Sequence, residues 1–152
     1  MKMNRRFGTA VLAFMAVLGF VVVGASPASA AISRFAGSGM CLDGYNGRAD
    51  GEVYVTGCNT GNFQRFDWSG SFTGKTRLRS QAQAGYCVQN AGSRVNLEPC
   101  SAAQLQEWEV QGRSGSLVIR QNNLCLARAL GEHPNRVIMQ ACNVLGSAWA
   151  LA

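Results

Sequence analysis

Hydrophobic and polar residues alternate along much of this chain in short runs, and turn-forming Gly, Asn and Ser residues separate the runs. Alternation with a period of two is typical of a β-strand that buries one face, with examples at residues 53–55, 94–97 and 107–110. About four runs of this kind fall in each third of the sequence after residue 30. The pattern therefore predicts an all-β fold of about twelve short strands.

The first 30 residues have a different pattern. Basic residues begin the segment, an uncharged apolar stretch covers residues 7–24, and small residues end the segment at Ala30. This order is typical of a secretory signal peptide over residues 1–30, so we expect a mature domain over 31–152 and a secreted, extracellular protein without a membrane segment. An uncleaved anchor is the alternative, because the apolar stretch nearly reaches the length that spans a bilayer.

Six cysteines after that segment mark an internal repeat. The second cysteine of each successive pair recurs every 42 residues, and a core-type aromatic residue follows each one at Phe66, Trp108 and Trp149. The sequence thus contains three copies of a unit of about 40 residues, over approximately 31–71, 72–115 and 116–152. Three copies around a pseudo-threefold axis would close the sheet and bring the aromatic residues into one core.

The cysteines predict covalent cross-links within each copy. An even count in an exported protein favours three disulfides, and the repeat favours one bond per copy among the fifteen pairings that six cysteines allow. The expected bonds are Cys41–Cys58, Cys87–Cys100 and Cys125–Cys142. No Cys-x-x-C motif occurs, which weakens zinc and thioredoxin-like interpretations, and we predict no metal or other cofactor.

Composition and charge argue against several function classes. Charged residues make up only 14% of the chain and Lys75 is the sole lysine after residue 30, so a helical bundle is disfavoured. The formal charge is +6 for the whole chain and +3 after residue 30, where the basic residues stand singly, so we expect no nucleic-acid partner. His133 is the only histidine, and Glu107 and Glu109 share one strand face rather than opposing each other, so we predict no enzymatic activity.

Each copy also carries a short motif. The first begins with Cys-Leu-Asp at residues 41–43, and the second ends in Gln-x-Trp at residues 106–108. Residues 64–66 have Phe in place of Trp, and residues 147–149 lack the Gln and follow their cysteine one residue sooner. With these motifs the chain resembles the ricin B-type β-trefoil lectins over residues 31–152. The resemblance implies a β-trefoil that binds carbohydrate.

The first copy has further shared positions, namely Asp43, Val-Tyr at residues 53–54, and an Asn-rich turn before Gln64. In these it resembles the repeat of the actinohivin-type, mannose-binding bacterial lectins. Matched by position, that resemblance implies sugar contacts from Asp43, Tyr54, Asn59 and Phe63. Phe63 stands where those lectins have Tyr, so it can stack but has no hydroxyl to donate. Three extra residues also separate Asp43 from Tyr54.

These residue types suit a sugar. A carboxylate accepts from neighbouring hydroxyls, an amide donates and accepts, and an aromatic face covers the apolar C–H patch of the ring. The other copies lack the set, because Gln89 and Ala127 stand at the Asp position and Asn96 and Ile138 at the Tyr position. The sequence therefore predicts one site, in the first copy.

Each candidate also has a purely structural interpretation. Asp43 and Asn59 can hold turns, Tyr54 can be half-buried packing, and we expect Gln64 and Gln106 to bond buried backbone. The resulting hypothesis is a secreted lectin for mannose-type or other neutral glycans that acts through the first repeat. Two alternatives remain: a protein-interaction module such as an inhibitor or toxin component, and a binder of acidic polysaccharide.

Overall fold

The computed structural model describes residues 30–45 and 51–152, so the predicted signal peptide lies outside the described residues except for Ala30. Fourteen short strands and two 3-10 turns make up this part of the chain. The first repeat carries β1 (Ala31–Ser33), β2 (Phe35–Gly37), β3 (Met40–Asp43), β4 (Tyr54–Gly57), η1 (Asn62–Gln64) and β5 (Phe66–Trp68). The second carries β6 (Lys75–Thr76), β7 (Arg79–Ser80), β8 (Tyr86–Asn90), β9 (Val95–Pro99), η2 (Gln104–Gln106) and β10 (Trp108–Arg113). The third carries β11 (Ser116–Gln121), β12 (Leu124–Arg128), β13 (Val137–Ala141) and β14 (Ala150–Leu151).

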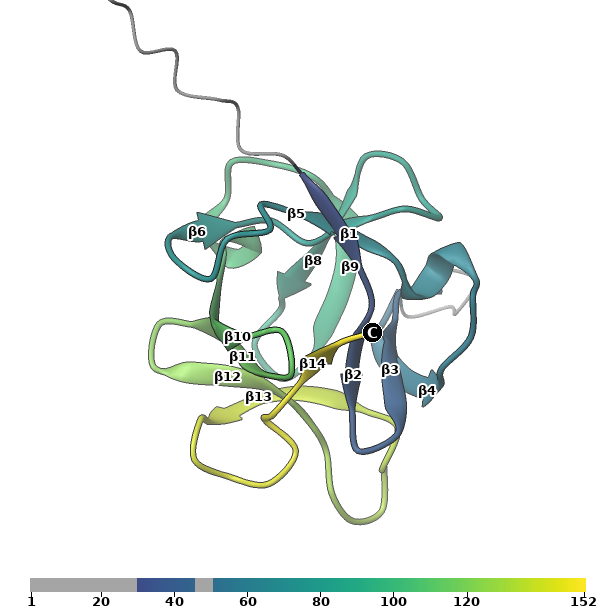
Figure 1. Cartoon of the computed structure of the whole chain (residues 1–152), viewed down its shortest axis with the longest axis vertical. Helices are drawn as coiled ribbons and strands as arrows, with labels where there is room; N and C mark the ends of the chain where they lie inside the picture. Colours follow the sequence, from purple (N-terminus) through teal and green to yellow (C-terminus); the bar gives the residue numbers. More distant parts are fainter. Residues whose placement is uncertain (1–29, 46–50) are drawn as a thin grey trace, which may run out of the picture.

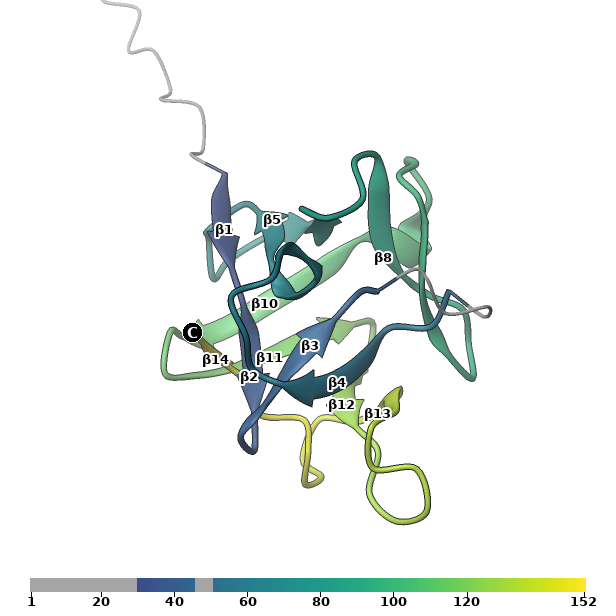
Figure 2. The ribbon, with the colours of Figure 1, turned by 90° about the vertical axis from the view of Figure 1, so that its right-hand side faces the viewer.

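The strands form three antiparallel sheets, and the chain passes from one sheet to another. Their orders are β1-β5-β7-β8-β9, β13-β12-β11-β10-β6 and β14-β2-β3-β4. At Arg34 the chain leaves the first of these sheets, where β1 pairs with β5, and enters the last, where β2 pairs with β14 and β3. A bridge between Leu117 and Trp149 links the second sheet to the chain just before β14. The three repeats thus surround a common centre (Figure 1), and the view at right angles shows the strands crossing one another around it (Figure 2).

The number of strands agrees with the sequence pattern once two interruptions are recognised. β1 and β2 are one run broken at Arg34, and β6 and β7 are one run broken at Arg77 and Leu78. Each break lies where the chain changes sheet, because a continuous strand cannot keep hydrogen-bond partners in both sheets. Twelve predicted strands thus become fourteen observed ones without a change of architecture.

Residues at equivalent repeat positions meet in the core. Val53, Val95 and Val137, spaced by 42, are all fully buried, and the amide of Val53 donates to the carbonyl of Val95 at 2.7 Å. The repeated aromatic residues Phe66, Trp108 and Trp149 are buried as well. Burial of one such side chain contributes about 1.5–3 kcal/mol, so the repeat of apolar positions supplies the main driving force for folding.

The indole donors of the core are satisfied by backbone. Trp108 Nε1 donates to the carbonyl of Val88 at 2.9 Å, and Trp149 Nε1 donates to the carbonyl of Leu126 at 2.8 Å. Val88 and Leu126 hold the same position in their repeats. Phe66, at the equivalent position of the first repeat, is also fully buried and has no side-chain donor to satisfy.

The three predicted disulfides are confirmed. Cys41–Cys58, Cys87–Cys100 and Cys125–Cys142 each join Cα atoms 4.9 Å apart. Each bond joins one strand of a repeat, β3, β8 or β12, to the loop that precedes the buried aromatic residue of that repeat. Among the described residues, none of the helical segments has the length and apolar character to cross a membrane.

Candidate functional site

Asp43 lies at the end of β3 and is almost entirely buried, with 4% of its surface exposed. Its Oδ1 accepts from the amide of Tyr45 at 3.0 Å, and its Oδ2 accepts from Nε2 of Gln64 at 3.1 Å. The first bond closes a side-chain turn of the kind Asp commonly makes. Asp43 therefore does hold a turn, and at the same time its carboxylate is fixed in one orientation.

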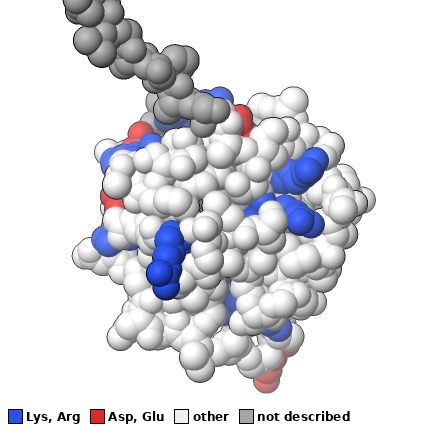
Figure 3. Space-filling model, viewed as in Figure 1, with Lys and Arg blue, Asp and Glu red and all other residues white. Residues whose placement is uncertain are grey.

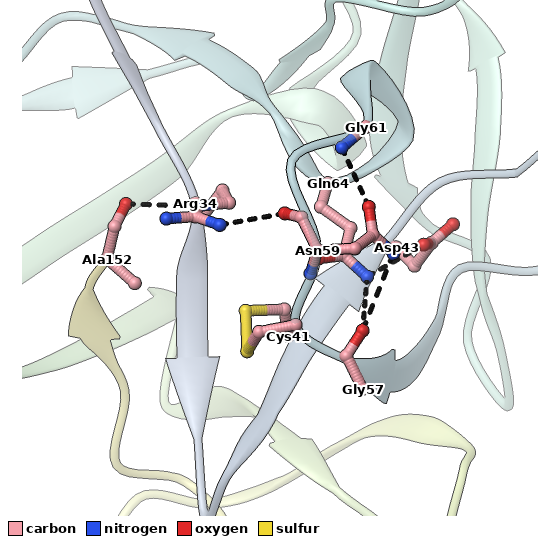
Figure 4. The surroundings of a disulfide bond; sticks show 9 residues. Arg34, Cys41, Asp43, Gly57, Asn59, Gly61, Gln64 and Ala152 are labelled. Carbon is pink, nitrogen blue, oxygen red and sulfur yellow. Dashed lines mark hydrogen bonds between the residues drawn. A yellow bond between two sulfur atoms is a disulfide. The ribbon is translucent and has the colours of Figure 1, made fainter.

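Gln64, on η1, connects Asp43 to the disulfide loop (Figure 4). Its side chain is fully buried, its Oε1 accepts from the amide of Asn59 at 2.8 Å, and its Nε2 also donates to the carbonyl of Gly57 at 3.0 Å. The expectation that Gln64 satisfies buried backbone is confirmed. Its remaining donor positions the Asp43 carboxylate, which the sequence did not indicate.

Asn59 is exposed and shapes the loop after Cys58. Its Oδ1 accepts from the amide of Gly61 at 2.7 Å, and its carbonyl accepts from Nη1 of Arg34 at 2.7 Å. Arg34 also donates through Nε to the carbonyl of Ala152 at 3.4 Å, so it connects this loop to the chain end (Figure 4). The turn interpretation of Asn59 is thus correct, and its Nδ2 makes only a 3.5 Å contact with the carbonyl of Gly57.

Tyr54, in β4, lies directly opposite Asp43 in the β3–β4 register. Cross-strand partners place their side chains on the same face of a sheet, so Tyr54 and Asp43 are neighbours on one surface. Tyr54 is partly buried and also lines a cavity with residues of the third repeat. Four sequence-predicted residues therefore gather around the end of β3, with Gln64 between Asp43 and Asn59.

Phe63 is 40% exposed and forms an aromatic pair that the sequence analysis missed. Tyr45, 43% exposed, meets it edge to face, with ring centroids 4.8 Å apart and planes at 87°. The Tyr45 amide is the one that donates to Asp43. The sequence could have indicated Tyr45, because it is an aromatic residue two positions after the turn-forming Asp43. It was missed because Tyr45 is not part of the repeat motif.

The arrangement has the chemistry that a sugar requires. Each carboxylate oxygen of Asp43 uses one lone pair on the protein and retains a second for a hydroxyl. Tyr45, whose amide bonds this carboxylate, and Phe63 have exposed rings that offer apolar surface to a pyranose C–H face. Fixed orientation lowers the ordering cost of binding, because Gln64 and the Tyr45 amide already hold the carboxylate.

The second repeat keeps the scaffold and loses the carboxylate. Gln106 is 1% exposed, accepts from the amide of Ser101 at 2.8 Å and donates to the carbonyl of Pro99 at 2.9 Å, as Gln64 does in the first repeat. Its other contact is with Oε1 of Gln89 at 3.0 Å. The exposed position before it is Leu105 rather than an aromatic residue.

The third repeat departs further. Ser147 replaces the Gln, and its hydroxyl makes 2.8 Å bonds to the carbonyls of Cys142 and Val144. Gly146, next to it, has φ +90°, and a Cβ there would lie 2.5 Å from the carbonyl oxygen of Arg128. A side chain at Gly146 is therefore excluded, and with Ala127 buried in place of the Asp this repeat has no comparable site.

Electrostatics away from the site involve separate surface ion pairs. Lys75 donates to Glu107 at 2.9 Å, and this hydrogen bond and charge lower the pKa of the Glu107 carboxyl below its ordinary value. Arg120 lies 3.6 Å from Glu109, so Glu107, just before β10, and Glu109, within it, each face a cation. On the face in Figure 3, basic side chains lie in separate places. The described residues contain no group of three metal-ligating side chains.

Comparison with known proteins agrees with this architecture, which is that of a β-trefoil. The model of the ricin-type beta-trefoil lectin domain matches residues 28–148, and the chain belongs to this family. Its fold is thus that of a carbohydrate-binding lectin. A comparison with curated protein sequences finds no match.

Solved structures with the same fold include lectins and a toxin. The β-trefoil lectin of the Vibrio vulnificus hemolysin/cytolysin with N-acetyl-D-lactosamine bound has a TM-score of 0.62 and 20% identity, over 82% of this chain and 95% of that one. SeviL bound to the asialo-GM1 saccharide has a TM-score of 0.64 and 12% identity, over 82% and 98%. The cytolethal distending toxin of Actinobacillus actinomycetemcomitans has a TM-score of 0.65 and 18% identity, over 80% and 90%.

Proposed function

We propose that the protein is a secreted lectin that binds a neutral glycan of mannose type through its first repeat and catalyses no reaction. The observation that carries the proposal is the Asp43 carboxylate, oriented by Gln64 beside the exposed rings of Tyr45 and Phe63. Gln89 and Ala127 replace that carboxylate in the other repeats. Family membership and the glycans bound to two structural neighbours support a carbohydrate ligand.

The carboxylate of Asp43 supports the choice of a neutral glycan. Asp43 accepts from the Tyr45 amide beside the aromatic pair, and a carboxylate accepts hydroxyl hydrogens but repels an acidic sugar. Basic residues are spread over several places on the face in Figure 3 rather than gathered in one patch. We therefore favour neutral glycans over acidic polysaccharide.

Secretion is supported by the cysteines. Three disulfides without a free cysteine in the described residues are typical of an oxidising compartment. Cleavage after Ala30 would release a chain that begins with β1. N-terminal sequencing of protein from the culture medium should read Ala31, whereas a retained Met1 in the membrane fraction would show an anchored protein.

The decisive experiment is a glycan array followed by calorimetric titration of the parent and two variants. Asp43→Asn should weaken binding roughly ten- to 150-fold, because loss of charge-assisted bonds costs about 1.5–3 kcal/mol. Gln89→Ala, at the equivalent position of the second repeat, is the matched control and should bind like the parent. Thermal unfolding of both variants verifies that each remains folded.

Other outcomes would support one of the two alternative functions or contradict the position of the site. Hits confined to sulphated glycans, with affinity that falls as salt rises, would indicate an acidic-polysaccharide binder. No glycan hit from the folded parent would overturn the lectin proposal and favour the protein-interaction module. Three sugars bound per chain, or full affinity in Asp43→Asn, would contradict the assignment of the site to the first repeat.

A further inference from the structure

A cavity of about 260 Å³ lies beside Tyr54, between the first and third repeats. It is lined by Glu52 and Tyr54 from one repeat and by residues 132–136 from the other. Typical ligand pockets hold about 300–1,000 Å³, so this cavity has room for a single ring rather than an extended ligand. None of the site residues expected from the sequence except Tyr54 belongs to it.

The strand register connects this cavity to the candidate site. Tyr54 pairs with Asp43 on one side and forms an isolated antiparallel bridge with Arg136 on the other. Residues directly opposite each other point to the same face, and neighbouring strands are about 4.8 Å apart. Asp43, Tyr54 and Arg136 therefore stand in a row on one surface, with the Asp43 carboxylate at one end and the cavity at the other.

A buried acid fixes the guanidinium in this cavity. Glu52 is 5% exposed, and its Oε1 accepts from Nε of Arg136 at 3.0 Å. Arg136 is itself 37% exposed at the side chain, and among the described residues its two terminal nitrogens have no protein partner. The ion pair thus fixes Nε of the guanidinium, and Arg136 lines the cavity.

The loop of the third repeat is anchored in place. The amide of Val55 donates to the carbonyl of Asn135 at 2.9 Å, and the amide of Arg136 donates to the carbonyl of His133 at 3.0 Å. Nε of Arg128 donates to the carbonyl of Pro134 at 2.7 Å. This wall of the cavity is therefore formed before any ligand arrives, which lowers the ordering cost of binding.

We propose that the cavity is a second sugar subsite, so that the ligand of the first-repeat site is an oligosaccharide of at least two residues. This inference rests on the proposed lectin function. The terminal sugar occupies the Asp43 end, and the next residue of the same glycan lies over Tyr54 and receives hydrogen bonds from Arg136. A guanidinium donates hydrogen bonds in a planar fork, which matches a pair of neighbouring sugar hydroxyls that accept them.

Affinities for matched mono- and disaccharides test the inference. The probes are methyl α-mannoside with the α1-2, α1-3 and α1-6 mannobioses, and galactose with N-acetyl-D-lactosamine. The parent should bind at least one disaccharide about tenfold more tightly than the matching monosaccharide. The second sugar would accept hydrogen bonds from the charged Arg136 side chain, and such bonds contribute more than neutral ones. Equal affinity for every pair would overturn the subsite while leaving the lectin proposal intact.

The variant Arg136→Lys assigns the effect to this residue. Lysine can keep the ion pair with buried Glu52, so the fold is preserved, but it lacks the two terminal nitrogens of the guanidinium. Affinity for the disaccharide should fall to that for the monosaccharide, and affinity for the monosaccharide should not change. Arg94, 42 residues earlier, has the equivalent position in the second repeat, so Arg94→Lys is the matched control and should behave like the parent.

The outcomes are distinct. A disaccharide advantage that persists in Arg136→Lys would overturn the assignment to the cavity. Loss of binding to both members of a pair in Arg136→Lys, with unchanged thermal unfolding, would place Arg136 in the first site and also overturn the subsite. Absence of binding by the folded parent in both sugar series would overturn the inference and the mannose-type ligand, whereas the lectin proposal itself falls only if the glycan array also gives no hit.

Discussion

The first and second repeats have the same scaffold and differ in what that scaffold holds. Gln64 and Gln106 are both buried, and each bonds one backbone amide and one backbone carbonyl at equivalent places. The third contact of Gln64 is a carboxylate, Asp43, whereas the third contact of Gln106 is an amide, Gln89. The bonds that stabilise the loop are therefore separate from the group that can bind a ligand. A repeat can lose the carboxylate without losing the fold.

The flanking surface differs in the same way. Tyr45 and Phe63 form an exposed aromatic pair in the first repeat, but Ala91 and Leu105 take those places in the second. Exposed positions contribute little to stability, so they vary freely between copies of a repeat. The comparison predicts that scaffold changes affect both repeats alike and that surface changes affect ligand binding in the first repeat alone.

The largest expected effect comes from the disulfides. Replacing both cysteines of Cys41–Cys58 or of Cys87–Cys100 with Ala should lower the free energy of unfolding by about 2–5 kcal/mol in either repeat. The closed loops, with separations of 17 and 13 residues, are similar in length, so the entropic contributions are similar. Urea denaturation measures both. A large loss in only one repeat would contradict the equivalence of the scaffolds.

The buried glutamines should separate stability from binding. Gln64→Ala and Gln106→Ala each leave a part-buried amide, of Asn59 or Ser101, without its acceptor and should cost about 1–3 kcal/mol of stability. Only Gln64→Ala also frees the Asp43 carboxylate, so only this variant should weaken glycan binding. Denaturation and calorimetric titration of the two variants check both parts. Equal binding by both would show that the orientation of Asp43 is unimportant.

A smaller effect is expected from the aromatic pair. Phe63→Tyr restores the hydroxyl found in the lectins that the first repeat resembles and should strengthen binding about two- to tenfold, the effect of one net hydrogen bond of about 0.5–1.5 kcal/mol. Because Phe63 is 40% exposed, stability should stay within about 0.5 kcal/mol. Leu105→Tyr in the second repeat is the control and should not change affinity.

The smallest effect belongs to a surface ion pair of the second repeat. Lys75 lowers the pKa of Glu107, so the pair stabilises the fold above the ordinary pKa of that carboxyl, and its contribution is lost as the pH falls through the lowered value. Lys75→Met should reduce this acid dependence, with Arg77 still 3.9 Å from Glu107, and should leave glycan binding unchanged. Thermal unfolding across the acidic range measures the difference. A marked stability loss at neutral pH would show that Lys75 is more than a surface partner.

Much of the fold was predictable because it depends on short distances along the chain. The threefold repeat of about 40 residues indicated which cysteines pair, which aromatic residues enter the core, and how many strand runs each repeat supplies. Asp43 and Gln64 were also recognisable, because their motif positions recur. The breaks at Arg34 and at Arg77 were not, since a change of sheet leaves no mark on the alternation of polar and apolar residues.

The sequence by itself determined the repeat, the disulfides, the buried aromatic positions and the single carboxylate of the first copy. These follow from local periodicity and from covalent chemistry, which act within one unit. Only the tertiary structure decided that Tyr45 meets Phe63 and that Arg136 stands beside Tyr54. These contacts depend on the conformations of the loops and on the strand pairing between repeats. The physical reason is that backbone pairing, and not distance along the chain, decides which side chains of two strands become neighbours.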